Sequence, residues 1–343
     1  MIATVTTSLL LYGCGNKPRP GSTPAIDAAI VPGADFLIRV KTKEILKTPF
    51  VKEAIEKQKK KTAGLNGEQS EAFFNATGLT KEDIESLLIS ADTDNVYAEV
   101  KKGKNAFDHM NAVVAFGLGK PLTLEKLKSG LATMLEKEGA QISEIKINNA
   151  AAIHIQSPRP DAANVSIALS QDQKIVYATI NQESLKEVLK REENGNVEKL
   201  SEALISVEKA LPADPQVRMA FLASETIQQN IMEAINTNKD NPGAAMMLGF
   251  IKLLQNLKSV SLGMTFHSGA ELNMAADLGE EEAQQASVLL NTMVIPMLQA
   301  NLVKQTGDET AADALKVEHD GTTLKMGFKI TEKQMGLLSP ATP

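Results

Sequence analysis

Hydrophobic and polar residues alternate along many short segments of this chain. Val260, Leu262 and Met264 alternate with serine and glycine, and the same period of two recurs within 164–170 and 322–330. A period of two is typical of antiparallel strands that bury one face. The chain is therefore expected to build antiparallel sheets.

Stretches with helical periodicity separate these strands, and together they predict an α+β fold of antiparallel sheets with helices packed on one face. Thr80 to Asp83 has the pattern of a capping box, which predicts that a helix begins there. Asn148-Asn149 is a two-residue loop that suits a hairpin. The expected strands are 35–40, 96–101, 111–118, 142–148, 151–157, 164–170, 174–181, 216–223, 259–267, 270–278, 314–319 and 322–330. The expected helices are 43–60, 80–90, 123–138, 182–193, 197–210, 224–237, 243–256 and 280–304.

The order of these elements occurs twice, which predicts a duplicated domain. The first strand of each copy opens at an aspartate, Asp35 or Asp214, and an arginine follows four residues later, Arg39 or Arg218. We expect the first copy to carry an additional hairpin, and its helix at 123–138 to correspond to the helix at 280–304. The expected organisation is a signal segment at 1–13, a lipidated cysteine with its tether at 14–33, a first repeat at 34–181, a helical connection at 182–213 and a second repeat at 214–343.

The single cysteine of the chain, Cys14, stands in Leu11-Tyr12-Gly13-Cys14 after a short apolar run. This motif resembles the lipobox of bacterial lipoproteins, in which a small residue precedes the cysteine that is acylated and becomes the mature N-terminus. Residues 15–24 are rich in proline and glycine, the composition of a tether that does not pack. The resemblance covers the first 14 residues and implies an exported protein that a lipid on Cys14 anchors to a membrane of the cell envelope.

The region before Cys14 departs from a complete signal peptide, because it is short and has no basic residue. Both features are consistent with a natural start upstream of Met1. The Pro-Ala-Asp opening at 212–214, with this element order in a secreted chain, resembles an uncharacterised family of bacterial envelope proteins. That family has no assigned chemistry that could be transferred to residues of this chain.

The composition argues against nucleic acid as a partner. The chain of 343 residues has a formal net charge of -6, five of its 36 basic residues are arginines, and aromatic residues make up 4%. Recognition of phosphates and bases relies on arginine and on exposed aromatic rings. With one cysteine, the chain can form no internal disulfide.

The sequence shows no arrangement typical of a catalytic or metal site. Gly117 to Pro121 lacks the residues of a P-loop or a dinucleotide fingerprint, so a turn before the next helix is expected. No pair with metal-ligand spacing occurs among the four histidines, which are His109, His154, His267 and His319. We therefore expect no catalytic residue, no cofactor and no metal.

Methionines are concentrated in the second repeat, where the helix at 280–304 is apolar on more than one face. Methionine fills irregular gaps in a core and also lines adaptable binding grooves. Core packing is the simpler interpretation, and a pocket for an acyl chain or an apolar peptide is the alternative. The contacts in such a pocket would be Met264, Met274, Met293 and Met297. Polar residues and a proline interrupt the helix, so we do not expect it to span a membrane.

These observations favour a non-catalytic lipoprotein of the cell envelope, a tethered binding or scaffolding module whose partner is a protein or another envelope component. The alternative is a carrier of a hydrophobic ligand in the second repeat. A large closed apolar cavity would favour the carrier, and a flat polar sheet face would favour the scaffold. Carboxylates clustered in a cleft with a histidine of perturbed pKa would favour an enzyme.

Overall fold

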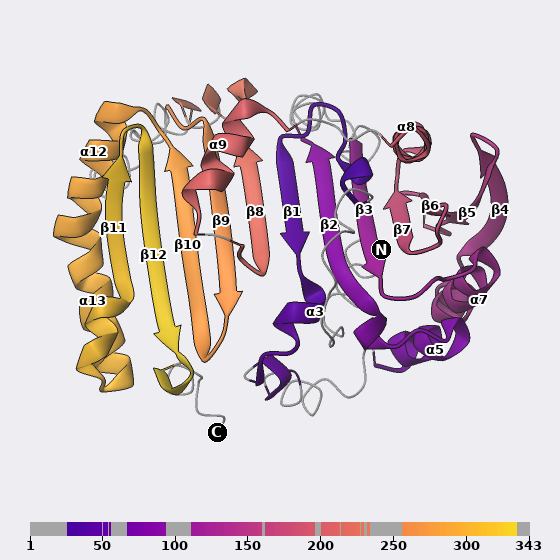
Figure 1. Cartoon of the computed structure of the whole chain (residues 1–343), viewed down its shortest axis with the longest axis horizontal. Coiled ribbons are helices and arrows are strands. Elements are labelled where there is room, and N and C mark those ends of the chain that lie inside the picture. The colour runs from indigo at the N-terminus through magenta and orange to yellow at the C-terminus, as the bar shows by residue number, and fades with distance from the viewer. Residues whose placement is uncertain are drawn as a thin grey trace. The chain divides into compact units, whose positions relative to one another are not determined.

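The computed structural model describes residues 26–93 except 50, 54 and 56–66, residues 111–195 except 160–161, and residues 200–334 except 213, 227, 230–231 and 234–255. Cys14 with its tether, the strand expected at 96–101 and nearly all of the helix expected at 243–256 lie outside the described residues. The chain divides into two compact units, Met1–Lys199 and Leu200–Pro343 (Figure 1).

The first unit contains an antiparallel sheet with the strand order β1-β2-β3-β7-β6-β5-β4. The strands are β1 (Phe36–Val40), β2 (Ile84–Asp92), β3 (Asn111–Leu118), β4 (Gln141–Ile147), β5 (Ala150–Gln156), β6 (Val165–Leu169) and β7 (Ile175–Thr179). Asn148 and Asn149 close the β4–β5 hairpin with φ angles of 49° and 65°. Asparagine tolerates this left-handed backbone, which a two-residue type I′ turn requires. The four hairpin strands predicted within 142–181 are confirmed.

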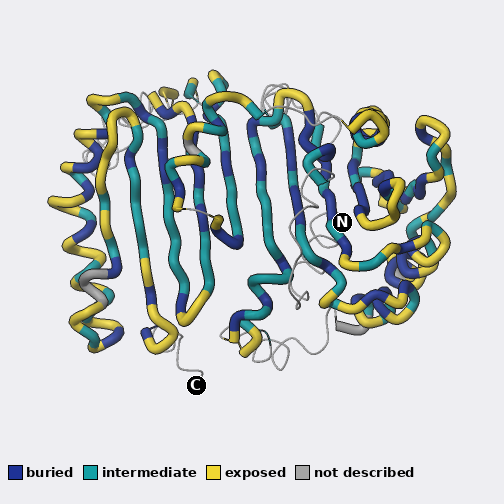
Figure 2. The backbone as a smooth tube through the Cα atoms, in the orientation of Figure 1, coloured by how far each residue is buried: buried dark blue, intermediate teal, exposed yellow. Residues whose placement is uncertain are grey.

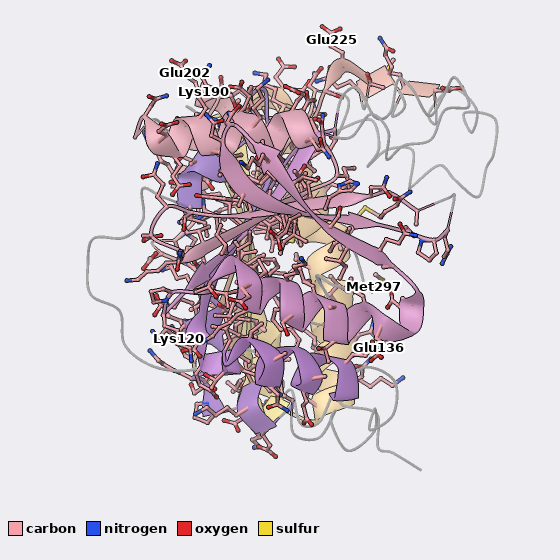
Figure 3. The ribbon with its side chains drawn as sticks, turned by 90° about the vertical axis from the view of Figure 1, so that its right-hand side faces the viewer. Lys120, Glu136, Lys190, Glu202, Glu225 and Met297 are labelled. Atoms are coloured by element: carbon pink, nitrogen blue, oxygen red, sulfur yellow. The ribbon has the colours of Figure 1, made fainter. Side chains whose placement is uncertain are left out.

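Helices cover both faces of this sheet. On one face α5 (Gly67–Thr77) and α7 (Leu124–Leu135) pack over a core that includes Leu87, Phe116 and Ile167. On the other face α8 (Gln182–Glu193) packs against β3, β6 and β7. Figure 3 shows the strands between α8, marked by Lys190, and α7, which leads to Glu136. The helices inserted between strands thus lie on one face, as predicted, and α8 follows the last strand onto the other.

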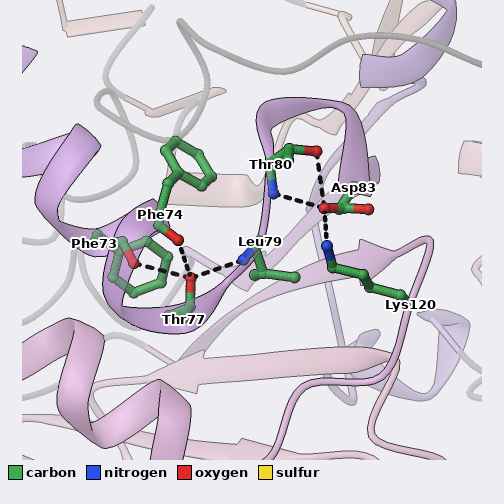
Figure 4. Close-up of polar contacts among 7 residues, drawn as sticks. All are labelled: Phe73, Phe74, Thr77, Leu79, Thr80, Asp83 and Lys120. Carbon is green, nitrogen blue, oxygen red and sulfur yellow. Dashed lines mark hydrogen bonds and ion pairs between the residues drawn. The ribbon is translucent and has the colours of Figure 1, made fainter.

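The helix predicted at 80–90 is wrong. The capping box between Thr80 and Asp83 exists, but it closes only the short 3₁₀ turn η2 (Lys81–Asp83), and Asp83 also binds Lys120 at 2.7 Å (Figure 4). The chain then enters β2, which is covered on both faces and has a register shift between Ile84 and Ser86. Its buried apolar residues therefore fall at the helix-like spacing i, i+3, i+4, i+7: Ile84, Leu87, Leu88 and Ala91.

Two other helices differ from the prediction. The one expected at 43–60 begins as α3 (Thr42–Ile45) and is interrupted by a turn at 46–48. The helix α5 was not predicted, although one side of it buries residues at helical spacing, which are Ser70, Phe73, Phe74 and Thr77. The Thr77 hydroxyl donates to the Phe73 carbonyl at 2.9 Å and accepts from the Leu79 amide at 3.3 Å, which ends the helix (Figure 4).

The second unit contains an antiparallel sheet with the strand order β8-β9-β10-β12-β11. The strands are β8 (Val217–Leu222), β9 (Ser259–Phe266), β10 (Gly269–Asp277), β11 (Leu315–Asp320) and β12 (Thr323–Thr331), all as predicted to within two residues. A short helix, α9 (Glu202–Ala210), precedes them. A long helix precedes β11 and comprises α12 (Glu280–Leu289), the π-helical segment η6 (Leu290–Val294) and α13 (Ile295–Thr306), with the 3₁₀ turn η7 (Glu309–Ala314) after it.

The two helical regions of the second unit lie on opposite faces of its sheet. Ala275 contacts Leu211, which follows α9, whereas Ala276 clusters with Leu290 of the long helix. Successive residues of a strand point to opposite faces. The long helix also packs along β11 and β12.

The strand order of the two units is the one that the predicted duplication requires. In each unit the first three strands lie next to one another in chain order, and a helix follows the third strand. The last two strands form a hairpin, and the second strand of this hairpin pairs with the third strand of the unit. The pair β3–β7 thus corresponds to β10–β12, and β4–β5 is the additional hairpin of the first copy. Arg39 on β1 pairs with Asp27 of the preceding η1 (Asp27–Ala29), and Arg218 on β8 pairs with Glu208 of the preceding α9 at 3.9 Å. Each arginine thus binds an acidic residue of the element before its strand, but Arg39 is the fourth residue of β1 and Arg218 is the second residue of β8. The predicted equivalence of the two aspartates is wrong, because Asp35 is buried and directly precedes β1, whereas Asp214 is exposed and two residues separate it from β8.

Candidate functional site: an open apolar face on the second unit

One face of the second sheet is apolar from strand to strand. Met274 lies opposite Leu262 on β9 and Met326 on β12, and this register brings alternate residues of all five strands to the same side. We call this surface the open face, because each of its members is partly exposed (Figure 2). Its members are Val217, Met219, Phe221, Val260, Leu262, Met264, Phe266, Leu272, Met274, Leu315, Val317, Met326 and Phe328.

Among the described residues, one end of this side of the sheet is fully covered. There Ala276 and Leu324 are buried against Ala286 and Leu290 of the long helix. Strands about 4.8 Å apart and alternating residues over about 20 Å of strand give the sheet region that carries the open face a flat area of roughly 400 Å².

The long helix next to β11 presents a second apolar surface. From Ala283 to Val303 it has no charged residue. On its outer side Val288 and Met297 are each 58% exposed, Met293 is 48% exposed and Leu298 is 38% exposed. By length and composition alone the helix from Glu280 to Thr306 could cross a membrane, although a helix that packs in a soluble domain can meet the same criterion.

Two side-chain amides attach this helix to the strand beside it. Asn291 donates to the Val317 carbonyl at 3.0 Å, and Gln299 donates to the Leu315 carbonyl at 3.4 Å. Amide contacts of this kind cover a strand that would otherwise present its backbone to other chains. Asn291 and Gln299 thus bind the neighbouring strand, whereas the apolar residues Met293 and Met297 face outward.

The π segment produces this orientation. Before it the buried positions follow an α-helical spacing that ends at Leu290, and after it the next buried position is Ile295, five residues later. Pro296 has no N–H to donate to the Thr292 carbonyl, and a wider turn accommodates such a break.

The structure brings together two of the four methionines predicted as ligand contacts. Met264 and Met274 both lie on the open face, on neighbouring strands. Met293 and Met297 lie on the outer side of the long helix. The alternation that builds the open face was predicted from the sequence, but helices were expected to cover that face.

A small apolar cavity lies in the first unit. It has a volume of about 60 Å³ and is lined by core residues that include Phe73, Phe116 and Leu131. A cavity of about 150 Å³ is needed to hold benzene. This space is therefore a gap in the packing beneath α5 and α7, too small for an acyl chain.

The polar motifs singled out in the sequence have structural partners. Gly117 to Pro121 is a turn, in which the Gly119 amide donates to the Asp83 carbonyl at 2.6 Å. Burial acts to raise the pKa of Asp83, but hydrogen bonds from Lys120 and Thr80 hold it below its usual range. His154 lies 3.2 Å from the Ser166 hydroxyl. Among the described residues, no group of three or more His, Cys, Asp or Glu is arranged to hold a metal ion.

Comparisons with known proteins identify no family and give a distant structural similarity. No protein-family model matches the chain, and no curated protein does. Among solved structures, the chain is similar to crystal form I of TP0453, with a TM-score of 0.43 and 10% identity over 94% of this chain and 98% of that one. A similarity at this level carries no argument about function.

Proposed function

We propose that this protein is a non-catalytic lipoprotein of the cell envelope that binds a partner protein through the open face of its second unit. The open face carries the proposal, because thirteen partly exposed apolar side chains on five strands form a continuous surface. The lipid anchor rests on the lipobox at Cys14, and the tether would hold the folded units at the membrane.

The shape of the open face favours a protein partner over a small ligand. A small molecule is usually bound in a concave site that covers most of its surface. The open face belongs to a sheet, and the described residues fully cover it at one end. Its flat area of roughly 400 Å² is about half of what one partner contributes to a standard protein interface, so the partner would also contact neighbouring surface.

A carrier of a hydrophobic ligand is the second candidate. It is favoured by the diagonal positions of Met264 and Met274 on neighbouring strands of the open face, because flexible methionines adapt to varied apolar ligands. An acyl chain on this surface would need a further covering layer, which makes the carrier the weaker proposal.

The test uses a matched pair of variants on β10. Met274→Asp places a charge on the open face, and Asn273→Asp places the same charge on the opposite face of the same strand. A photoreactive residue at position 264 should form an adduct with a partner protein in cells, and a second one at position 328 should form the same adduct. Met274→Asp should abolish both adducts, and Asn273→Asp should leave both.

The alternatives give different products. Adducts with lipid alone would favour the carrier and overturn the protein-binding proposal. Adducts only within the chain itself would show that its own residues cover the open face, which would also overturn it. Thermal unfolding of both variants distinguishes a lost contact from a lost fold.

The anchor is tested separately. Stable attachment to a membrane needs two or more acyl chains, and Cys14 is the residue expected to carry them. Cys14→Ser should therefore move the protein from the membrane fraction to the soluble fraction of the envelope. Retention of the variant on membranes after a high-salt wash would contradict the lipobox interpretation.

A further inference from the structure

The first unit has a hollow of about 400 Å³ at the end of its sheet where the hairpin turns lie. Four separate segments form it: the start of α7, the β4–β5 turn, the β6–β7 turn and the end of α8. Its volume falls within the range of small-molecule sites, about 300–1,000 Å³. It is distinct from the 60 Å³ core cavity of the same unit and from the open face.

The lining of the hollow combines an apolar wall with acceptors of hydrogen bonds. Leu124, Leu169 and Leu189 contribute the apolar wall. Glu192 and Glu193 contribute carboxylates from the last turn of α8, where the negative end of the helix dipole also favours a cation. None of the described residues that line it is lysine or arginine.

The two turns are fixed in place by bonds to α8. Asn148 donates its side-chain N–H to the Lys186 carbonyl at 3.0 Å, so its amide oxygen is the part that can accept from a ligand. The Gln171 amide donates to the Glu192 carboxylate at 2.9 Å. Asn148 and Asn149 line the hollow, and both have the left-handed backbone of a tight turn. The site is therefore preorganised.

Among the described residues, no lysine or arginine lowers the pKa of the partly buried Glu192 carboxyl. Burial raises the pKa of this carboxyl, the Gln171 amide lowers it, and the nearby Asp172 raises it further. A buried carboxylate is stabilised by a cation that replaces lost water. An occupant with a positive charge would supply that stabilisation.

We propose that this hollow binds an organic cation of the alkylammonium class, with the aliphatic stem against Leu124, Leu169 and Leu189 and the ammonium group at Glu192 and Asn148. A lysine side chain is built in this way, with an apolar stem and a charged end, and so is a free polyamine. The remaining volume accommodates the backbone next to a lysine or the rest of a polyamine. An anion is disfavoured by the two carboxylates.

The experiment measures binding to the full chain by calorimetry and by NMR. The probes are 1,5-diaminopentane, the neutral 1-pentanol of the same stem length, and the peptide acetyl-Ala-Lys-Ala-amide. The diamine and the peptide should bind with a Kd of about 1 mM, as expected for few-atom ligands, and 1-pentanol should bind at least tenfold more weakly. Tighter binding of the peptide would identify a lysine-bearing protein as the source of the cation, and tighter binding of the diamine would identify a free amine.

Matched variants separate a site from an unspecific attraction. Glu192→Gln should weaken diamine binding tenfold or more, because a glutamine keeps the bond from Gln171 but loses the charge. Glu187→Gln removes the same charge from an exposed position of the same helix and should change nothing. Asn149→Gly keeps the left-handed turn and removes one amide, and a threefold loss is expected. Equal binding of 1-pentanol, equal effects of the two glutamate variants, or no saturable binding would overturn the proposal.

Discussion

The two units share a strand order and differ in how one face of each sheet is covered. In the first unit Leu87, Phe116 and Ile167 are buried beneath α5 and α7. In the second unit the corresponding surface is the open face, and the long helix reaches only one end of it before following β11. The alternation of residues along strands creates an apolar face in both units. Whether that face becomes a core depends on where the helix between the third strand and the last hairpin lies.

The largest expected effect comes from a matched pair of leucines on the second strand of each unit. Leu87 on β2 is 2% exposed, whereas Leu262 on β9 is partly exposed. Leu87→Ala should lower the free energy of unfolding by about 3 kcal/mol, because it leaves a cavity in a packed core. Leu262→Ala should lower it by about 1 kcal/mol, since less burial is lost.

Urea unfolding, followed by probes in each unit, measures both changes. Equal losses for the two leucines would contradict the comparison, because they would mean that the open face is packed like the core of the first unit.

A smaller effect is expected where α5 and α7 meet to form the cover of the first unit. A Cβ on Gly130 would lie 2.5 Å from the Thr77 Cγ2 and 2.9 Å from the Phe73 Cδ2. Overpacking costs about 1–3 kcal/mol and exceeds the gain in helix propensity of about 1 kcal/mol. Gly130→Ala should therefore lower the midpoint of thermal unfolding, and Ser129→Ala, at the exposed neighbouring position, should not. A stabilised Gly130→Ala would show that the two helices are not in close contact.

The attachment of the long helix to β11 should contribute less. Asn291→Ala removes the bond to the Val317 carbonyl, and a typical hydrogen bond contributes about 1 kcal/mol. Hydrogen exchange of the amides in β11 should become faster. Asn301→Ala, on the exposed side of the same helix, is the control. Unchanged exchange in β11 after Asn291→Ala would mean that the helix does not protect this strand.

The smallest effect is a dependence of stability on pH in the first unit. Because burial raises the folded-state pKa of Glu192, the folded chain binds more protons than the unfolded chain between the two pKa values. Stability therefore falls as pH rises through that interval. Glu192→Gln should raise the Tm slightly at pH 7 and leave it unchanged near pH 4. A lower Tm for the variant at pH 7 would contradict this sign.

Much of the fold could be predicted from the sequence. The hairpins follow from period-two alternation and from turns such as Asn148-Asn149, and the duplication follows from the repeated order of elements. The strand β2 was mistaken for a helix because it is buried on both faces, so its apolar residues lose the period of two. A sequence pattern indicates which residues tend to be buried, but it does not indicate which helix or strand covers them.

The candidate sites were harder to predict for the same reason. The alternation at 259–267 marked one strand of the open face, but its exposure depends on the path of a helix twenty residues later. The hollow in the first unit combines Leu124, Asn148 and Glu192, which only the strand order brings together. Side chains that meet through topology leave no local motif.

The π segment in the long helix has the effect of absorbing one residue without changing which side of α13 faces the sheet. Across it Leu290 and Ile295 are both buried although five residues separate them, whereas an α-helix brings residues four apart to the same side. Deleting one residue within Leu290–Val294 would therefore restore an α-helical spacing and leave Ile295 inward and Met297 outward. If all residues were kept and the segment became α-helical, α13 would turn by about 100° relative to α12, the rotation of one residue. The wide turn thus lets the long helix carry a residue more than a regular α-helix would need while the outward position of Met297 is kept.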